Sequence, residues 1–159
     1  MFYPKHWRKS LTALAVVAVA LVSRGWAVNA VLHAAALGSK MHVTQVSVGW
    51  EYSGASKQPH AYVFIRDEFG NPVNGALVTG DWSGCNTKKG ASATTQTFYN
   101  PDGTIRFDGA AQVFGRKHSC LKSNCNFTFT VTNVSMTRMT YDPASNVTSS
   151  GSAPCNPLF

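Results

Sequence analysis

Two runs of apolar residues, separated by a short polar segment, dominate residues 63–84. The separating segment holds a Gly-Asn-Pro sequence at positions 70–72, where regular structure is interrupted because glycine accepts a positive φ and proline fixes its own φ. The pattern predicts a strand, a tight turn and a second strand that ends near Trp82. We expect the later strands of the chain to pack on these two.

Alternation of apolar and polar residues, the period of a half-buried strand, recurs along the chain after residue 40. The positions that it assigns to the core include Ala61, Val63, Ile65, Phe127, Phe129 and Val131. The predicted strands are residues 41–52, 60–67, 76–82, 94–99, 104–107 with 111–114, 126–134 and 135–141. Because seven or eight short strands alternate with turn signals and no helical period follows, the sequence predicts an all-β fold, a β-sandwich of antiparallel strands.

The predicted sandwich covers residues 41–143 and includes a loop at residues 83–93, which are rich in glycine, lysine, serine and asparagine. Residues 144–159 are rich in serine, asparagine, glycine and proline. We therefore expect them to form an irregular tail that carries one cysteine.

The first 30 residues have the pattern of a secretory signal peptide. A short basic segment precedes an apolar run at residues 11–22, which is shorter than the roughly 20 residues needed to span a bilayer and is ended by Arg24. Cleavage after Ala30, or as late as residue 36, would release the mature protein, with residues 31–40 as a linker. The alternative is that the leader is not cleaved and serves as a helical membrane anchor. We expect membrane contact only in that case. The sequence thus predicts export to the periplasm, the cell surface or the extracellular space.

The net charge of +7 comes largely from this leader. Four of the 14 basic residues, Lys5, Arg8, Lys9 and Arg24, lie in it, which leaves ten basic residues against seven acidic ones. A nucleic-acid-binding surface needs a stronger and more clustered positive charge. We therefore expect no nucleic-acid partner.

The sequence contains four cysteines, Cys85, Cys120, Cys125 and Cys155, and an even number in an exported protein predicts two disulfides. A local Cys120–Cys125 bridge with a Cys85–Cys155 bridge is the simplest pairing, and a crossed pairing of Cys85 with Cys120 or Cys125 remains open. Zinc is a further alternative, since His118 lies near Cys120, but structural zinc sites usually show two tight ligand pairs. We predict disulfides, no metal and no cofactor.

Candidate binding residues fall into two groups. A basic group would form one rim if its two loops meet at one end of the sandwich, and it consists of Lys88, Lys89, Arg116, Lys117, His118 and Lys122. Such a rim suits an acidic polysaccharide or an acidic protein. The aromatic candidates for ligand contact are Trp50, Tyr52 and Trp82. No histidine or acidic pair stands in a recognisable catalytic pattern, so we predict no enzymatic activity.

A wider set of residues gives the chain a family resemblance. These residues are Met41-His42-Val43, Asp67, Gly70-Asn71-Pro72-Val73, Gly75-Ala76, Val78, Gly80, Trp82-Ser83-Gly84, Asp102-Gly103-Thr104, Phe107, Phe127, Phe129, Val131, Asn133-Val134 and Tyr141-Asp142-Pro143. With them, residues 41–146 resemble the bacterial immunoglobulin-like (Ig-like) and fibronectin-type-III-like modules of secreted multidomain proteins. The resemblance implies an Ig-like sandwich that serves as a spacer or a binding appendage.

From these features we expect a non-catalytic exported module that acts through protein–protein contact, as an accessory subunit or a component of a surface assembly. The alternative is a module that binds carbohydrate or an envelope polymer through exposed aromatic rings and the basic loop. Function inferred from a fold is analogy, so the residues of the site have to decide between these hypotheses.

Overall fold

The computed structural model describes residues 39–53, 56–117 and 125–155 of the chain. The chain divides into two units, Met1–His33 and Ala34–Phe159, and every described residue belongs to the second. The predicted signal peptide helix lies outside the described residues, as does most of the predicted linker. The part of the chain that is described contains no helix with the length and hydropathy of a membrane span.

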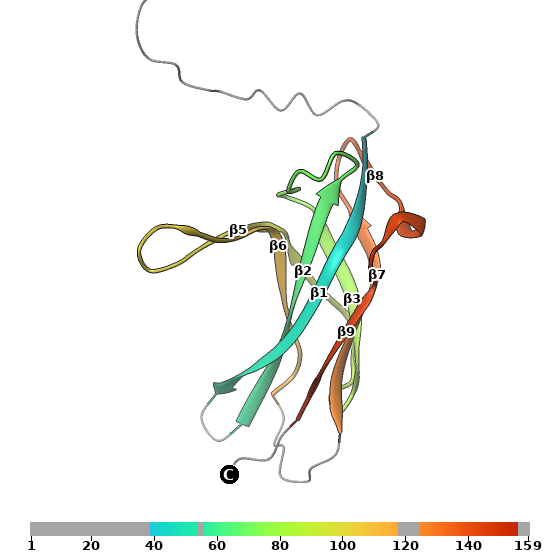
Figure 1. Cartoon of the computed structure of the whole chain (residues 1–159). Helices are drawn as coiled ribbons and strands as arrows, with labels where there is room; N and C mark the ends of the chain where they lie inside the picture. Colours follow the sequence, from blue (N-terminus) through green and yellow to red (C-terminus); the bar gives the residue numbers. More distant parts are fainter. Residues whose placement is uncertain (1–38, 54–55, 118–124, 156–159) are drawn as a thin grey trace, which may run out of the picture. The chain divides into compact units, whose positions relative to one another are not determined.

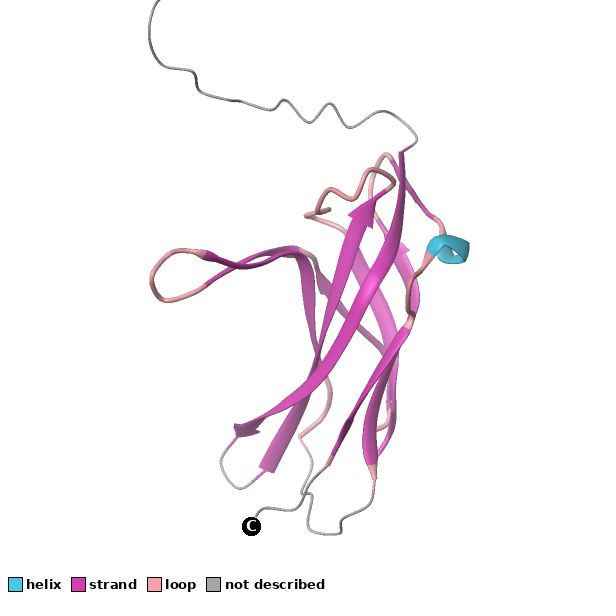
Figure 2. Ribbon diagram, in the orientation of Figure 1, coloured by secondary structure: helices cyan, strands magenta, loops and turns pink. Residues whose placement is uncertain are grey.

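Within the described residues, nine strands form two sheets that face each other as a β-sandwich (Figure 1, Figure 2). The five-stranded sheet has the order β5-β6-β2-β1-β8 and the four-stranded sheet the order β4-β3-β7-β9. The strands are β1 (Ser39–Ser53), β2 (Ser56–Asp67), β3 (Leu77–Gly84), β4 (Lys88–Thr94), β5 (Gln96–Tyr99), β6 (Ile105–Phe114), β7 (Asn126–Ser135), β8 (Met139–Tyr141) and β9 (Ser150–Pro154). Paired neighbours run antiparallel except β1 and β8, which form a short parallel pair.

The core lies between the two sheets, and its residues occupy the alternate positions that the sequence pattern predicts. Ala61, Val63 and Ile65 of β2 are fully buried, while the residues between them are only half-buried. On the opposite sheet Phe127 and Phe129 of β7 are fully buried as well. The all-β sandwich and its core-facing residues are therefore confirmed.

The turn at positions 70–72 joins the two sheets instead of closing a hairpin, since β2 and β3 belong to different sheets. The Asp67 carboxylate orders the turn by accepting hydrogen bonds from the backbone N–H groups of Phe69 and Asn71. The chain then crosses to the second sheet, with Val73 and Ala76 buried on the way. The expected pair of strands thus contributes one strand to each layer.

A second crossing occurs at Thr95, in the middle of the strand predicted at residues 94–99. This residue is buried, donates its N–H to the Ala76 carbonyl at 2.8 Å and accepts the Ala76 N–H on its hydroxyl at 2.9 Å. β4 before it lies in the four-stranded sheet and β5 after it in the five-stranded sheet. The prediction of one strand is wrong, and so is the prediction of a loop throughout residues 83–93, because β4 begins at Lys88.

The C-terminal tail is not irregular throughout, because residues 150–154 form β9 on the edge of the four-stranded sheet. β9 pairs with β7 from Asn126↔Pro154 to Thr130↔Ser150. An edge strand needs only ladder hydrogen bonds on one side, so a polar sequence without apolar alternation can form it. The predicted domain boundary at residue 143 therefore falls too early.

The β5–β6 hairpin extends away from the body of the sandwich, and we call residues 96–108 the arm (Figure 1). β6 bends at its base, where Gly109 has a φ of 63°. The Asp108 carboxylate accepts hydrogen bonds from Thr97 at 2.7 Å and from Asn74 at 2.8 Å, while Arg66 donates to the Asp108 carbonyl at 2.8 Å. These donors hold the pKa of Asp108 below its usual value. The direction of the arm is thus set by a polar network.

Replacement of Gly109 with alanine should destabilise the protein more than the same change at Gly103 in the tip of the arm. Both glycines have a positive φ, which costs about 1–2 kcal/mol for an L-residue. Only at Gly109 would the new Cβ collide, at 2.8 Å from the Val73 nitrogen, whereas it meets nothing within 4 Å at Gly103. We expect about 1–3 kcal/mol of additional loss at Gly109, measured by urea unfolding. Equal losses of stability in the Gly109→Ala and Gly103→Ala variants would contradict a tightly packed bend at Gly109.

Candidate functional site

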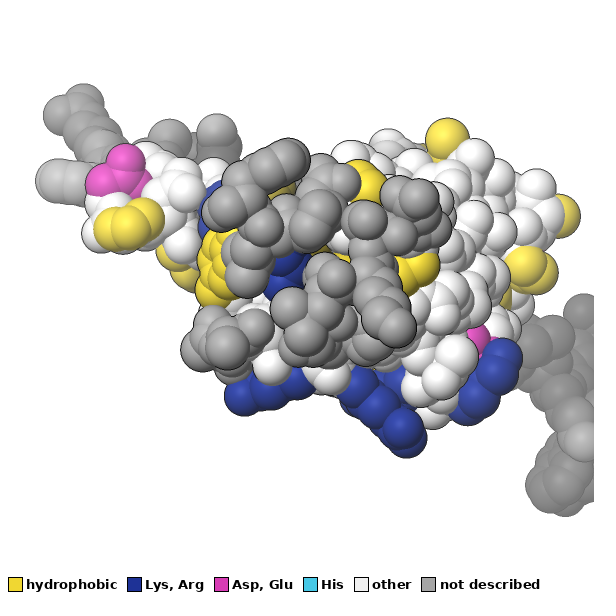
Figure 3. Space-filling view, turned by 90° about the horizontal axis from the view of Figure 1, so that it is seen from below, with side chains coloured by type: hydrophobic (Ala, Val, Ile, Leu, Met, Phe, Trp, Pro, Cys, Tyr) yellow, Lys and Arg dark blue, Asp and Glu magenta, His cyan; other side chains and the backbone are white. Residues whose placement is uncertain are grey.

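One end of the sandwich collects cationic residues from three elements, and we call Lys57, Lys88, Lys89, Arg116 and Lys117 the basic end. Two loops meet here, since the Asn86 side chain donates to the Arg116 carbonyl at 2.6 Å and accepts the Arg116 N–H at 3.2 Å. Figure 3 views this end of the molecule and shows Lys and Arg side chains along one border of it. The structure thus brings four of the six predicted rim residues to one end, while His118 and Lys122 lie outside the described residues.

The cationic side chains of the basic end differ in whether they form hydrogen bonds or ion pairs with other residues of the protein. Lys88 donates to the Phe114 carbonyl at 3.1 Å, and Lys89 forms an ion pair with Asp81 at 2.8 Å. This contact and the Gly90 N–H hold the pKa of Asp81 below its usual value. Arg116 and Lys117 are exposed, and within the described ranges neither side chain has an ion pair.

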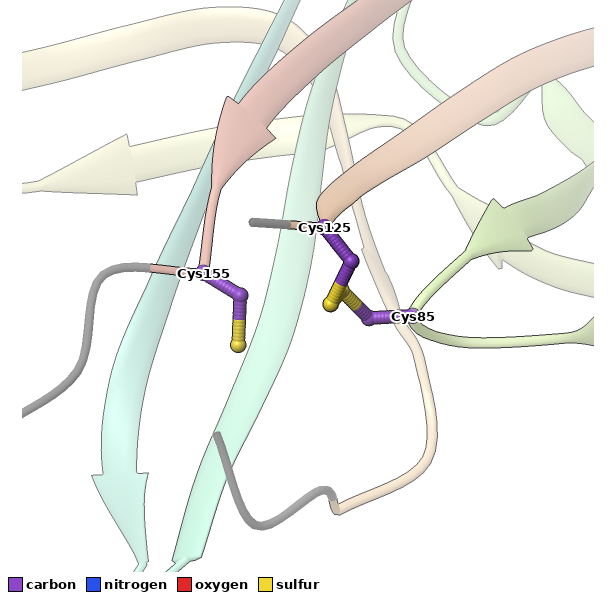
Figure 4. A group of neighbouring side chains, drawn as sticks. All are labelled: Cys85, Cys125 and Cys155. Atoms are coloured by element: carbon purple, nitrogen blue, oxygen red, sulfur yellow. A yellow bond between two sulfur atoms is a disulfide. The ribbon is translucent and has the colours of Figure 1, made fainter. Parts of the chain in front are cut away.

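A cluster of sulfur atoms lies at the same end (Figure 4). Cys85 follows β3 and Cys125 precedes β7, and the two form a disulfide with a Cα–Cα distance of 5.5 Å. The local Cys120–Cys125 bridge is therefore wrong, as is the Cys85–Cys155 bridge, and the crossed pairing of Cys85 with Cys125 is confirmed. The reason is tertiary, because β3 and β7 are neighbours in one sheet and the Cys85 N–H donates to the Asn126 carbonyl at 3.0 Å.

Cys155 completes the cluster from the end of β9. It is buried, it is disulfide-bonded, and its N–H donates to the Cys125 carbonyl at 3.0 Å. Cys120 is the fourth cysteine of the sequence and lies outside the described residues. The Sγ atoms of Cys85, Cys125 and Cys155 lie within 4.8 Å of one another, a spacing open to a metal ion, but bridged sulfurs are not the thiolates that bind metals. In this structure the Cys85–Cys125 bridge joins the end of β3 to the start of β7 at this end of the sandwich.

The three aromatic candidates have different environments. Trp82 is fully buried against Phe129, with ring centroids 5.0 Å apart, so the hypothesis that it stacks on a ligand is wrong. Trp50 is half-buried, and the Lys57 ammonium lies 3.6 Å from the centroid of its ring. Tyr52 is 59% exposed and packs edge-on against Trp50 at 5.2 Å. Only Tyr52 presents a largely exposed ring beside the basic end.

The structure also reveals a group of rings that the sequence analysis did not treat as a candidate site. We call them the aromatic face, and they are His60, Tyr62, Phe64, Phe98, Phe107 and Phe114. They lie on the outer side of the five-stranded sheet and at the base of the arm, in edge-on or tilted contacts with ring centroids 4.9–6.5 Å apart. The available signal was aromatic residues at the outward positions of residues 60–67.

His60 stands at one end of the aromatic face. Burial lowers its pKa, an effect that nearby Glu51 opposes, and its Nδ1 atom has no hydrogen-bond partner among the described residues. Burial therefore disfavours the charged form of His60, in keeping with the apolar rings around it.

Searches against family models, curated proteins and solved structures gave no match for this chain. The resemblance to bacterial Ig-like modules therefore stays a prediction at the level of the family, beside the observed two-sheet sandwich.

Proposed function

We propose that this chain is a non-catalytic, exported module of Ig-like type that binds a partner protein through its aromatic face and its arm. It would act as an accessory subunit or as a component of a surface assembly. The observation that carries the proposal is a set of half-buried rings on a sheet face against which none of the described elements packs as a further layer. Contiguous apolar surface of this kind is typical of protein contact sites.

The chemistry of the rings favours a protein over a sugar. Four of the six are phenylalanines, which supply apolar area but no hydrogen-bonding group. Sugar recognition needs polar groups placed between stacking rings, whereas the centre of a protein interface is rich in aromatic residues and poor in charged ones. Arg106, whose guanidinium lies 4.9 Å from the ring of Phe107, adds a residue type that is enriched in interfaces.

The arm provides a second argument. An isolated two-stranded hairpin is marginally stable in water, yet this one exposes two large apolar residues, Tyr99 at 63% and Ile105 at 60%. The polar network around Asp108 fixes its direction, so a partner would meet a preorganised surface. We infer that a partner covers the arm and the adjoining rings.

Export is supported by the disulfide. A Cys85–Cys125 bridge and a bridged Cys155 at one end of a small domain are typical of proteins that fold in an oxidising compartment. The predicted signal peptide is the sequence argument for the same location.

The arm variant Tyr99→Ser/Ile105→Ser should lose its partner while keeping its fold, because both side chains are exposed. We expect at least a tenfold loss of a specific protein captured from the envelope fraction of the producing cells. The variant Phe69→Ser/Val147→Ser removes two other exposed apolar residues and should capture that protein as the wild type does.

The captured protein, produced separately, should then form a defined complex with the wild type in size-exclusion chromatography with light scattering. Capture that is unaffected by the arm variant, or that is lost equally in both variants, would refute an arm-mediated contact.

A further inference from the structure

We propose that the basic end is a second binding site, independent of the aromatic face, for an acidic polysaccharide that bears carboxylate or sulfate groups along its length. The site would use Arg116 and Lys117 for the acidic groups and Tyr52 for the face of a sugar ring, while Lys88 and Lys89, which are engaged within the protein, add to the positive potential around them.

The first argument is the distribution of charge along the described chain. The basic end and its surroundings contain five cationic residues, one of which, Lys57, is buried, and two acidic ones, Glu51 and Asp81. The other described residues include four cationic ones, Lys40, Arg66, Arg106 and Arg138, and five acidic ones, Asp67, Glu68, Asp102, Asp108 and Asp142. The positive charge of the sandwich is thus concentrated at one end, where it attracts a polyanion.

The second argument is that the backbone of this end is held rigidly. Asn86 is buried and uses both ends of its amide on the backbone of Arg116. Lys88 bonds to the Phe114 carbonyl, and the Cys85–Cys125 bridge lies directly beside Asn86 in the sequence. Because the backbone that carries Arg116 is held before binding, less conformational entropy of the backbone is lost on binding.

The third argument is the presence of an exposed ring, Tyr52, at the same end of the sandwich as the cations. Gln58 of β2 donates to the Gly115 carbonyl at 3.2 Å, so the segment that carries Arg116 lies along β2. On the other side of β2, Tyr52 is the direct partner of Lys57 in the β1–β2 ladder. A tyrosine ring offers an apolar face and a hydroxyl, which suits a sugar that is apolar on its C–H face and polar at its rim.

These features favour a polysaccharide over other polyanions. Duplex nucleic acid is bound through many simultaneous phosphate contacts, and two of the four rim cations are already engaged within the protein. Attachment to an anionic membrane needs a broad apolar face in addition to positive charge. At this end of the described structure Tyr52 is the one large exposed apolar residue, which is too little for such a face.

The experiment uses the purified protein with its disulfides formed and measures binding to polygalacturonate by isothermal titration calorimetry, with neutral dextran as the comparison polymer. The variant Arg116→Gln/Lys117→Gln should bind polygalacturonate at least tenfold more weakly than the wild type. Tyr52→Ser should cost about fivefold, the loss of one ring contact. Raising the salt from low to physiological ionic strength should weaken wild-type binding.

A matched control, Lys40→Gln/Arg138→Gln, removes two positive charges outside the basic end and should leave binding within about twofold. The arm variant Tyr99→Ser/Ile105→Ser should also bind the polymer normally, so failure of the protein-binding proposal would not affect this result. Equal losses in both charge variants, equal binding to dextran, or tighter binding to duplex DNA or anionic vesicles at the same salt would overturn the proposal.

Discussion

Replacing Trp82 with alanine is expected to lower the free energy of unfolding by about 3–5 kcal/mol, the range for large aromatic side chains in well-packed cores. Trp82 is 0% exposed and is the largest fully buried side chain of the described structure. Its indole N–H makes no hydrogen bond there, so its contribution comes from packing, including the contact with Phe129. Urea unfolding with the disulfides intact measures the loss.

Leu77→Ala on the same strand is the matched control, because that side chain is exposed and should lose about 1 kcal/mol or less. If the two variants were equally stable, the sandwich would not be organised around the buried tryptophan. A fully active binding module after Trp82→Ala would in addition show that neither proposed surface depends on the core packing beneath it.

Removing the Cys85–Cys125 bridge by replacing both cysteines with alanine should cost about 4 kcal/mol. The bridge closes a loop with a sequence separation of 40, and the chain-entropy model gives a loss of this size. A native domain is stable by only about 5–15 kcal/mol, so the variant should unfold at a much lower urea concentration. It should also bind acidic polymer more weakly, because the bridge holds the loop beside Asn86.

The wild type in excess thiol reductant provides the comparison, since it loses the bridge of Cys155 as well and should be less stable than the variant without reductant. Peptide mapping without reduction should recover the Cys85–Cys125 pair. Recovery of a Cys120–Cys125 pair, or a double variant as stable as the wild type, would contradict the observed connectivity.

Local pattern was sufficient to predict which side chains of the long strands are buried. Alternation along residues 60–67 and 126–134 identified the buried side chains of β2 and β7, because successive residues of a strand point to opposite faces. The same pattern placed Tyr62 and Phe64 on the outer face. It carried no information on what the outer face contacts, so the array that these rings form with Phe98 and Phe107 was missed.

The local sequence pattern could not predict the connections between the two sheets. The crossing at Thr95 depends on hydrogen bonds with Ala76, which lies far away in the sequence. β9 forms from a polar segment because β7 has unpaired backbone groups along one edge, with which β9 can pair. Which strand has an unpaired edge is known only once the sheet is assembled. Polar composition alone therefore predicted a loop where an edge strand stands.

For the candidate site, too, the sequence predicted the residues involved but not their arrangement in space. Composition identified the two basic loops, because lysine and arginine are concentrated in two short segments. That these loops lie side by side depends on the hydrogen bonds of Asn86 and on β3 and β6 ending at the same end of the sandwich. The sequence by itself determined the strand period, the buried residues of the long strands and the residues of the basic loops, because these depend on neighbours within a few positions. Only the tertiary structure decided the sheet order, the pairing of Cys85 with Cys125 and the convergence of the rings and cations, because each depends on which distant segments become neighbours when the core closes.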